Sequence, residues 1–148
     1  NAWILSVGNC PVGFVGINQL LPLNENVYNW GFYTFAGAAK IKGVGRLIEL
    51  HVLDFLFNVK SAETIICEVY QKNTEVLNLH KKFRFEIVEK FTVKATEDKE
   101  TENVCRLILK RNVWLKSKNS IFNNNIKRAG VSTVVVFMSE HCIELKKY

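Results

Sequence analysis

Residues 40–46 of this chain read Lys-Ile-Lys-Gly-Val-Gly-Arg and stand between a predicted strand and a predicted helix. Before them, the aromatic and β-branched run Val27–Phe35 is typical of a strand. After them, apolar residues recur at helical spacing from Val44 to about Asn58. Glycines at such a junction let backbone N–H groups turn outward beside the positive end of the helix dipole, which suits a pyrophosphate. Gly-x-Gly before a helix is also ordinary turn chemistry, so the motif alone leaves both interpretations open.

A second strand-to-helix passage lies downstream. Thr64–Val69 is a β-branched run that predicts a buried strand, and Asn73 followed by Glu75 is a helix-start signal. Asn73 and His80 are about two helical turns apart and project to nearly the same side of this helix. The pair is either a ligand-facing edge, or an ordinary N-cap together with a half-buried packing histidine.

Further strands flank these two passages. Ala2–Val7 and Val12–Leu21, separated by turn residues, predict a hairpin in front of the aromatic strand. Phe85–Lys94 and Asn103–Lys110, separated by a charged turn, predict two strands after the second helix. The predicted order is therefore strand, strand, strand, helix, strand, helix, strand, strand.

Charge and composition restrict the function classes. The 148 residues are 48% hydrophobic, enough for one compact core, and carry a formal net charge of +6. Most of the excess positive charge lies in residues 111–148, so the body of the chain is close to neutral and nucleic-acid binding is disfavoured. No apolar run reaches the roughly 18 residues that cross a bilayer, and no secretory signal precedes Trp3. We expect a soluble, cytoplasmic protein that does not bind membranes.

The four cysteines point to neither a disulfide framework nor a metal. No C-x-x-C pair and no histidine at metal-ligand spacing accompany them, so no metal is expected. Cys67 and Cys105 lie inside apolar runs, where free thiols pack as small buried hydrophobes.

Together, the two passages resemble the Gcn5-related N-acetyltransferase (GNAT) superfamily. Its acetyl-CoA motif, Q/R-x-x-G-x-G/A, is matched by 40–45 with Lys40 in the first position. Its second motif, N-x-x-A-x-x-L-Y-x-K-x-G-F, is matched at Asn73, Leu79, Lys82 and Phe85. Its Ala, Tyr and Gly are replaced by Val76, His80 and Arg84. The resemblance covers about residues 1–116 and leaves 117–148 as a C-terminal extension of unknown role.

This resemblance implies an α+β fold with a central mixed, mostly antiparallel sheet and flanking helices. Superfamily members begin with a strand and two helices that this chain lacks before its first hairpin, and it opens on Asn1 without an initiator Met. We therefore expect an N-terminally truncated domain.

The resemblance also implies acetyl-CoA as cosubstrate, no metal, and direct acetyl transfer to an amine. Glu68 is the candidate base, with a solvated strand-end carboxylate as the alternative, and His80 stands where the family has the Tyr that protonates the leaving thiolate. Trp3, Trp30 and Tyr33 are candidates to line the acceptor pocket, with positions in the hydrophobic core or on a sheet face as the alternative. The residues implied to hold acetyl-CoA are Phe32, Tyr33, Thr34, Phe35, Lys40, Lys42, Gly43, Val44, Gly45, Arg46 and Asn73.

Within the superfamily, the stretches 28–33, 43–45, 83–86 and 107–114 look like the PseH-type enzymes. Those enzymes acetylate the 4-amino group of a UDP-linked 4-amino-4,6-dideoxy sugar in pseudaminic acid biosynthesis, which makes a small amino-sugar nucleotide the expected partner. Ribosomal-protein alanine acetyltransferases share much of the pattern, so a protein N-terminus is an alternative acceptor. A catalytically inactive CoA-binding module is a third hypothesis, and the sequence leaves open whether the chain forms a homodimer.

Overall fold

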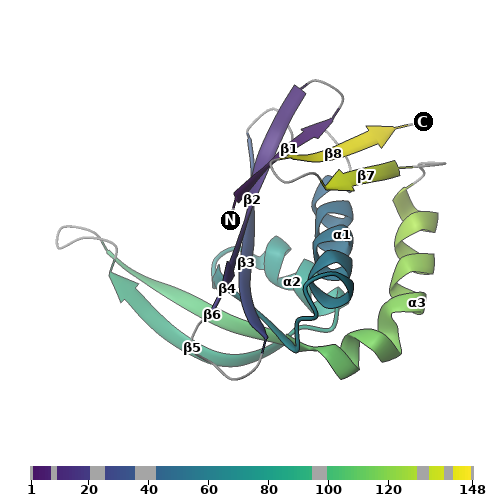
Figure 1. The fold of residues 1–148 in the computed structure, drawn as a ribbon. Helices are drawn as coiled ribbons and strands as arrows, with labels where there is room; N and C mark the ends of the chain where they lie inside the picture. The colour runs from purple at the N-terminus through teal and green to yellow at the C-terminus, as the bar shows by residue number, and fades with distance from the viewer. Residues whose placement is uncertain are drawn as a thin grey trace.

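The computed structural model describes residues 2–7, 10–20, 26–35, 43–94, 100–129, 134–138 and 142–147. Within these ranges eight strands form one sheet, and three helices lie on the same side of it (Figure 1). The strands are β1 Ala2–Val7, β2 Cys10–Gln19, β3 Val27–Thr34, β4 Thr64–Tyr70, β5 Glu86–Lys94, β6 Thr101–Lys110, β7 Val134–Met138 and β8 Cys142–Lys147. The helices are α1 Val44–Asn58, α2 Thr74–Lys82 and α3 Arg111–Ala129.

The strands are ordered β5-β6-β4-β3-β2-β1-β8-β7 across the sheet. The pairs β3–β4 and β1–β8 are parallel, and the other neighbouring pairs are antiparallel. The predicted α+β fold with a mixed, mostly antiparallel sheet is confirmed.

Burial alternates along the central strands and decides which face carries the helices. On β4 the side chains of Ile65, Cys67 and Val69 are buried in the core, while those of Glu68 and Tyr70 are exposed. Side chains point to opposite faces at successive positions of a strand, so the apolar set packs under the helices and the other set forms an outer face. We use the term outer face for this helix-free side of the sheet.

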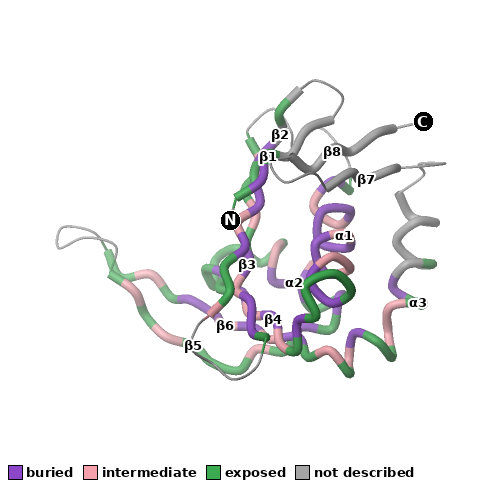
Figure 2. The backbone as a smooth tube through the Cα atoms, viewed as in Figure 1, coloured by how far each residue is buried: buried purple, intermediate pink, exposed green. Residues whose placement is uncertain are grey.

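Helix α1 forms the centre of the core because most of its circumference is apolar. Leu50, Leu53, Leu56 and Phe57 are almost completely buried. In Figure 2 much of α1 has the purple of buried residues. The Phe57 ring stacks on Trp114 of α3 with 5.7 Å between centroids. This stacking ties α3 to the core that α1 shares with the sheet.

The C-terminal part of the chain differs from the sequence-based expectation. No helix was predicted after the strand that ends at Lys110, whereas the structure continues from β6 into α3, in which Trp114 is fully buried. Ile121, in the extension of unknown role, is also buried. Farther on, β8 pairs with β1 and β7 pairs with β8, so this extension adds two strands to the same sheet.

None of the helices in the described ranges combines the length and apolar character needed to cross a bilayer. Cys67 and Cys105 are free and buried, as their apolar surroundings predict.

Candidate active site

Strands β3 and β4 pair over a short distance and then separate. Their parallel ladder joins Val27 to Thr64, Tyr28 to Ile65 and Asn29 to Ile66. Beyond this point β3 continues to Thr34 beside β2, and β4 continues to Tyr70 beside β6. Each of the two strands therefore has an edge that the other does not pair with. Backbone N–H and C=O groups on such an edge can pair with an extended ligand.

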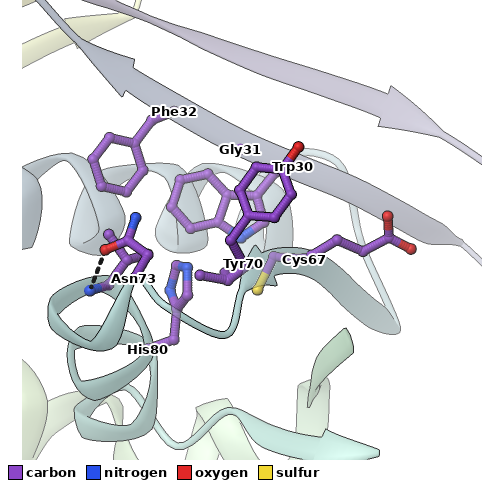
Figure 3. Close-up of a pocket in the computed structure, with 10 residues that line it drawn as sticks. Trp30, Gly31, Phe32, Cys67, Tyr70, Asn73 and His80 are labelled. Carbon is purple, nitrogen blue, oxygen red and sulfur yellow. Dashed lines mark hydrogen bonds between the residues drawn. The ribbon is translucent and has the colours of Figure 1, made fainter. Parts of the chain in front are cut away.

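A cleft of about 130 Å³ opens where the strands separate (Figure 3). The rings of Trp30 and Phe32 stack at 5.7 Å between centroids and form an apolar wall on the β3 side. Helix α2 and its cap supply polar side chains on another side. The lining residues are Trp30, Gly31, Phe32, Cys67, Glu68, Val69, Tyr70, Asn73, Val76 and His80.

The N-terminus of α1 lies beside this cleft. Gly43 caps the helix with φ of 83°, no side chain of the described residues caps the first turn, and that turn contains no acidic residue. The ideal Cβ position of Gly45 is 3.5 Å from side-chain atoms of Phe32 and Leu79, which places the first turn against the β3 wall and α2. The free N–H groups and the positive end of the helix dipole therefore stand next to the cleft.

The predicted phosphate-loop residues differ in what they can offer. The Val44 side chain is buried, so this residue presents only its backbone, while Arg46 is partly exposed. Lys40 and Lys42 lie outside the described residues.

Asn73 is the N-cap of α2 and also lines the cleft. Its Oδ1 accepts a hydrogen bond from the Val76 backbone N–H at 3.3 Å. Its side-chain NH₂ group has no partner within the described ranges. The capping and the ligand-facing interpretations are therefore compatible, because they use different atoms of the same amide.

His80 is far more buried than a half-buried packing residue, with only 3% of its surface exposed, and it lines the cleft. Its Nδ1 lies 2.7 Å from Oε1 of Glu49 on α1, and its ring meets Trp30 edge-on. Figure 3 shows the imidazole rising from α2 toward the Trp30 ring.

Glu49 contacts His80 at the wall of the cleft and was not predicted from the sequence. It is completely buried, and burial raises the pKa of its carboxyl, an effect that the hydrogen bond and charge of His80 oppose. The available signal was its position, because Glu49 precedes the buried residues Val52, Leu53 and Leu56 at helical spacing. An acid on an apolar helix face needs a buried partner.

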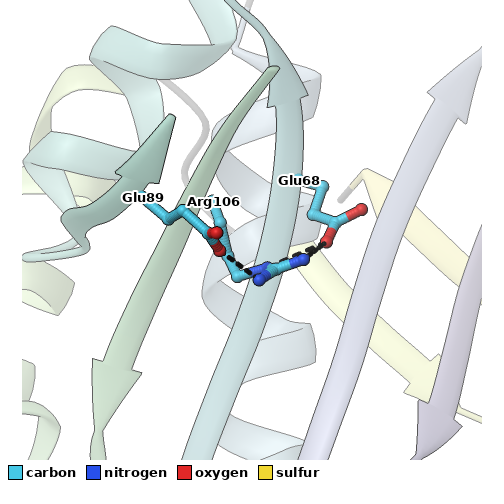
Figure 4. A network of polar contacts seen from close by, with 3 residues as sticks. All are labelled: Glu68, Glu89 and Arg106. Carbon is cyan, nitrogen blue, oxygen red and sulfur yellow. Dashed lines mark hydrogen bonds and ion pairs between the residues drawn. The ribbon is translucent and has the colours of Figure 1, made fainter. Parts of the chain in front are cut away.

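Glu68 lines the cleft, and its carboxylate belongs to an exposed network on the outer face (Figure 4). Arg106 of β6 donates to Oε1 of Glu68 from Nε at 3.0 Å and from Nη2 at 2.8 Å, and its Nη1 donates to Glu89 of β5. Both measured bonds end on Oε1, so Oε2 of Glu68 has no hydrogen-bond partner among the residues that the structure describes. That oxygen is free to accept a proton.

The comparisons with known proteins assign the fold. No family model matches the sequence, and no curated protein matches it. Among solved structures, a GNAT-family acetyltransferase from Bacillus anthracis aligns with a TM-score of 0.61 at 16% identity, over 71% of this chain and 61% of its own. The spermidine/spermine N-acetyltransferase SpeG from Vibrio cholerae, solved with manganese ions, aligns at 0.64 and 15%, over 72% and 61%.

A SpeG structure from the same organism in complex with CoA and spermine aligns with a TM-score of 0.63 at 15% identity, over 71% of this chain and 61% of its own. This chain has the GNAT fold. It spans about three fifths of the length of these solved structures.

The aromatic residues predicted to line the acceptor pocket of this GNAT fold do not lie together. Trp3 is buried and its ring contacts Phe55 of α1, whereas Trp30 lines the cleft. Tyr33 is 60% exposed on the outer face and stacks on Phe14 at 5.9 Å. The reason is strand geometry, because residues three positions apart on β3 point to opposite faces.

The predicted pantetheine-binding stretch 32–35 lies along the free part of β3 and just beyond its end. Phe32 lines the cleft, Thr34 is partly exposed, and Phe35 is exposed with its ring edge toward Tyr33. Within the described ranges, no cluster of His, Cys, Asp and Glu is suited to hold a metal ion.

Proposed function

We propose that the protein is an acetyl-CoA-dependent N-acetyltransferase. The observation that supports this most is the separation of β3 from β4 beyond Asn29 and Ile66, with a cleft at that point and the uncapped N-terminus of α1 beside it. A strand edge suits the amides of a pantetheine arm, and a helix N-terminus suits a pyrophosphate. The two lie side by side, as one cosubstrate with both groups requires.

The residues present fit acetyl-CoA in their chemistry. The first turn of α1 has no carboxylate that would repel phosphate, and its N–H groups from Gly43 to Arg46 are available as donors. The backbone of Phe32–Phe35 pairs with the pantetheine amides, and the NH₂ of Asn73 donates to the same arm. Lys40 and Lys42 precede this helix in the sequence, and we include them as further cationic residues of the proposed phosphate site.

Acetyl-CoA supplies an activated acyl group as a thioester, which an amine attacks directly. A backbone N–H on the free edge of β3 stabilises the negative charge that develops on the carbonyl oxygen. Oε2 of Glu68 accepts the proton of the attacking amine, directly or through water. His80, at the α2 wall of the cleft, donates a proton to the sulfur of the departing CoA.

The acceptor is proposed from the sequence resemblance, which favours the 4-amino group of a UDP-linked 4-amino-4,6-dideoxy sugar. A protein N-terminus is the alternative acceptor, and an inactive CoA-binding module is the alternative from another class. The structurally similar SpeG is a spermidine/spermine N-acetyltransferase, so a polyamine is a further acceptor to test.

The experiment is a thiol-release assay with acetyl-CoA and these three amines, combined with calorimetry of acetyl-CoA binding. We expect amine-dependent release of CoA with the amino sugar as the best acceptor. Faster release with a peptide or spermidine would replace the proposed acceptor. Binding without release against any amine would identify an inactive module, and the absence of acetyl-CoA binding would overturn the proposal.

A further inference from the structure

The buried contact between Glu49 and His80 joins two helices at the wall of the cleft. Glu49 belongs to α1 and His80 to α2, and the 2.7 Å contact between Oε1 and Nδ1 is a strong, charge-assisted geometry in the protein interior. Both residues are almost completely removed from solvent. Burying a carboxyl group costs free energy unless a partner compensates for it. A buried Glu49–His80 pair beside the cleft therefore suggests a functional role.

The hydrogen bond fixes which ring nitrogen of His80 is left for the cleft. Nδ1 is taken by Glu49, while Nε2 has no partner among the residues that the structure describes. Trp30 and Phe85 pack on the ring from β3 and from the residue before β5, and neither titrates. The imidazole therefore contacts two aromatic rings, and Glu49 of α1 is its only polar partner among the residues that the structure describes.

The pair presents the same atom to the cleft in either of its protonated forms. A charged imidazole donates from Nδ1 to an ionised Glu49, whereas a protonated Glu49 donates to Nδ1 of a neutral imidazole. In both forms Nε2 carries hydrogen. Burial raises the pKa of Glu49, and the hydrogen bond and charge of His80 oppose this effect.

No other polar group among the described residues near the Glu49–His80 pair forms a hydrogen bond with either side chain. Oε2 of Glu49 and the indole N–H of Trp30 are buried without hydrogen-bond partners within the described ranges, and both residues contact His80. Cys67 of β4 lies within electrostatic range of Glu49 and Glu68, and burial raises the pKa of its thiol, which keeps it neutral. Lys81 and Lys82 follow His80 on α2 and are exposed.

We propose that Glu49 is a positioning residue that holds Nδ1 of His80, so that Nε2 delivers the proton to the leaving group. The proposal rests on the proposed acetyltransferase activity. When the C–S bond breaks, the sulfur keeps the electron pair and takes the proton from Nε2, and the imidazole becomes neutral while Nδ1–H still donates to the Glu49 carboxylate. Water then returns a proton to Nε2.

The kinetic test compares Glu49→Gln with the wild-type chain. Gln keeps an oxygen that accepts from Nδ1–H but removes the negative charge that stabilises a protonated imidazole. We expect kcat to fall roughly tenfold to a hundredfold, part of the about 10²–10⁴-fold that a general acid contributes. The KM for acetyl-CoA stays unchanged, and the loss of kcat at high pH begins at lower pH. Glu49→Asp, which keeps the charge but is shorter, restores part of kcat.

The matched control is Asp54→Asn, because Asp54 is an acid on the same helix that bonds only to Asn58 among the described residues and has no contact with the cleft. This variant should keep the wild-type pH profile. Wild-type kcat and pH profile in Glu49→Gln would overturn the proposal.

A second measurement does not depend on activity. Nitrogen-15 NMR of His80 in the wild-type chain at alkaline pH reports which ring nitrogen keeps its hydrogen, and we expect Nδ1. Hydrogen on Nε2 under those conditions would overturn the proposal even if Glu49→Gln does not fold. Failure of the wild-type chain to release CoA with any amine would instead overturn the proposed function, and the NMR result would still decide whether Glu49 holds Nδ1.

Discussion

The ideal Cβ position of Gly45 lies 3.5 Å from Cζ of Phe32, so the first turn of α1 packs against the wall of the cleft. This distance is an ordinary van der Waals contact, and an alanine side chain fits there. A valine adds two methyl groups to the same space. We therefore expect the fold to accommodate alanine at position 45, whereas the larger valine should interfere with a ligand bound at the N-terminus of α1.

We expect Gly45→Val to weaken acetyl-CoA binding by about tenfold or more, equivalent to about 1.4 kcal/mol. The physical reason is that the added methyl groups occupy the approach to the N–H groups of the first turn. Calorimetry measures the affinity, and Gly45→Ala, with a wild-type melting temperature, is the control. Unchanged affinity in Gly45→Val would remove this helix end from the proposed site.

Gly43 responds to substitution for a different reason. Its φ of 83° lies in the left-handed region, and no atom of the described residues beyond its chain neighbours lies within 4 Å of its ideal Cβ position. A side chain at this position would strain the backbone rather than collide with a neighbour. We expect Gly43→Ala to lower the free energy of unfolding by about 1 kcal/mol. Asn tolerates this conformation better, so Gly43→Asn should cost less in urea denaturation. Equal stability of Gly43→Ala and wild type would show that the cap adopts another conformation.

Glu68 and Glu89 provide a matched pair, because both bind Arg106 but only Glu68 lines the cleft. We expect Glu68→Gln to lower kcat by about 10²–10⁴-fold, the usual contribution of a general base. Glu89→Gln should leave kcat unchanged. Neither variant should lose more than about 1 kcal/mol of stability, because exposed ion pairs contribute little. Equal kcat values for both variants would restrict Glu68 to the ion-pair network.

The sequence was sufficient for those parts of the fold that depend on local patterns. Aromatic and β-branched runs predicted β3 and β4, and the helix-start signal at Asn73 is the observed cap of α2. Helix α3 was missed because its apolar residues, such as Trp114 and Ile121, are spread among Asn, Lys and Ser without a regular stripe. Its helical structure depends on burial of Trp114 against Phe57, a tertiary contact.

The site was predictable only where its residues are close in sequence. Asn73 and His80 share one helix, so their common side followed from helical spacing. Glu49 and His80 are 31 residues apart on different helices, and only the packing of α1 against α2 brings them together. The grouping of Trp30 with Tyr33 failed for a local reason, since strand alternation already places residues three apart on opposite faces.

The buried Glu49 predicts a specific pH dependence of stability. Its folded-state pKa is raised above the ordinary 4.5, so its contribution is fully present below that value. As pH rises through the raised pKa this contribution is lost, because the unfolded chain releases the proton more easily. Glu49→Gln cannot titrate at this position, so its melting temperature relative to wild type should increase as pH rises above the ordinary pKa of 4.5. Exposed Glu75 on α2 provides the control Glu75→Gln, and a constant difference for Glu49→Gln would contradict the prediction.

We expect the fold to require the C-terminal extension up to the end of α3 but not the strands β7 and β8 that follow it. Strands β7 and β8 only continue the sheet beyond β1, whereas Ile121 of α3 is 5% exposed and packs in the core. A chain ending at Ala129 should therefore fold with a similar melting temperature. A chain ending at Lys118 loses Ile121 and should unfold at lower temperature or lower urea concentration.

The matched point variant is Ile121→Ala, for which we expect a loss of about 2–4 kcal/mol from the free energy of unfolding, typical of a large-to-small change in a core. If the chain ending at Ala129 unfolds while Ile121→Ala remains stable, the pairing of β8 with β1 rather than α3 holds the edge of the sheet.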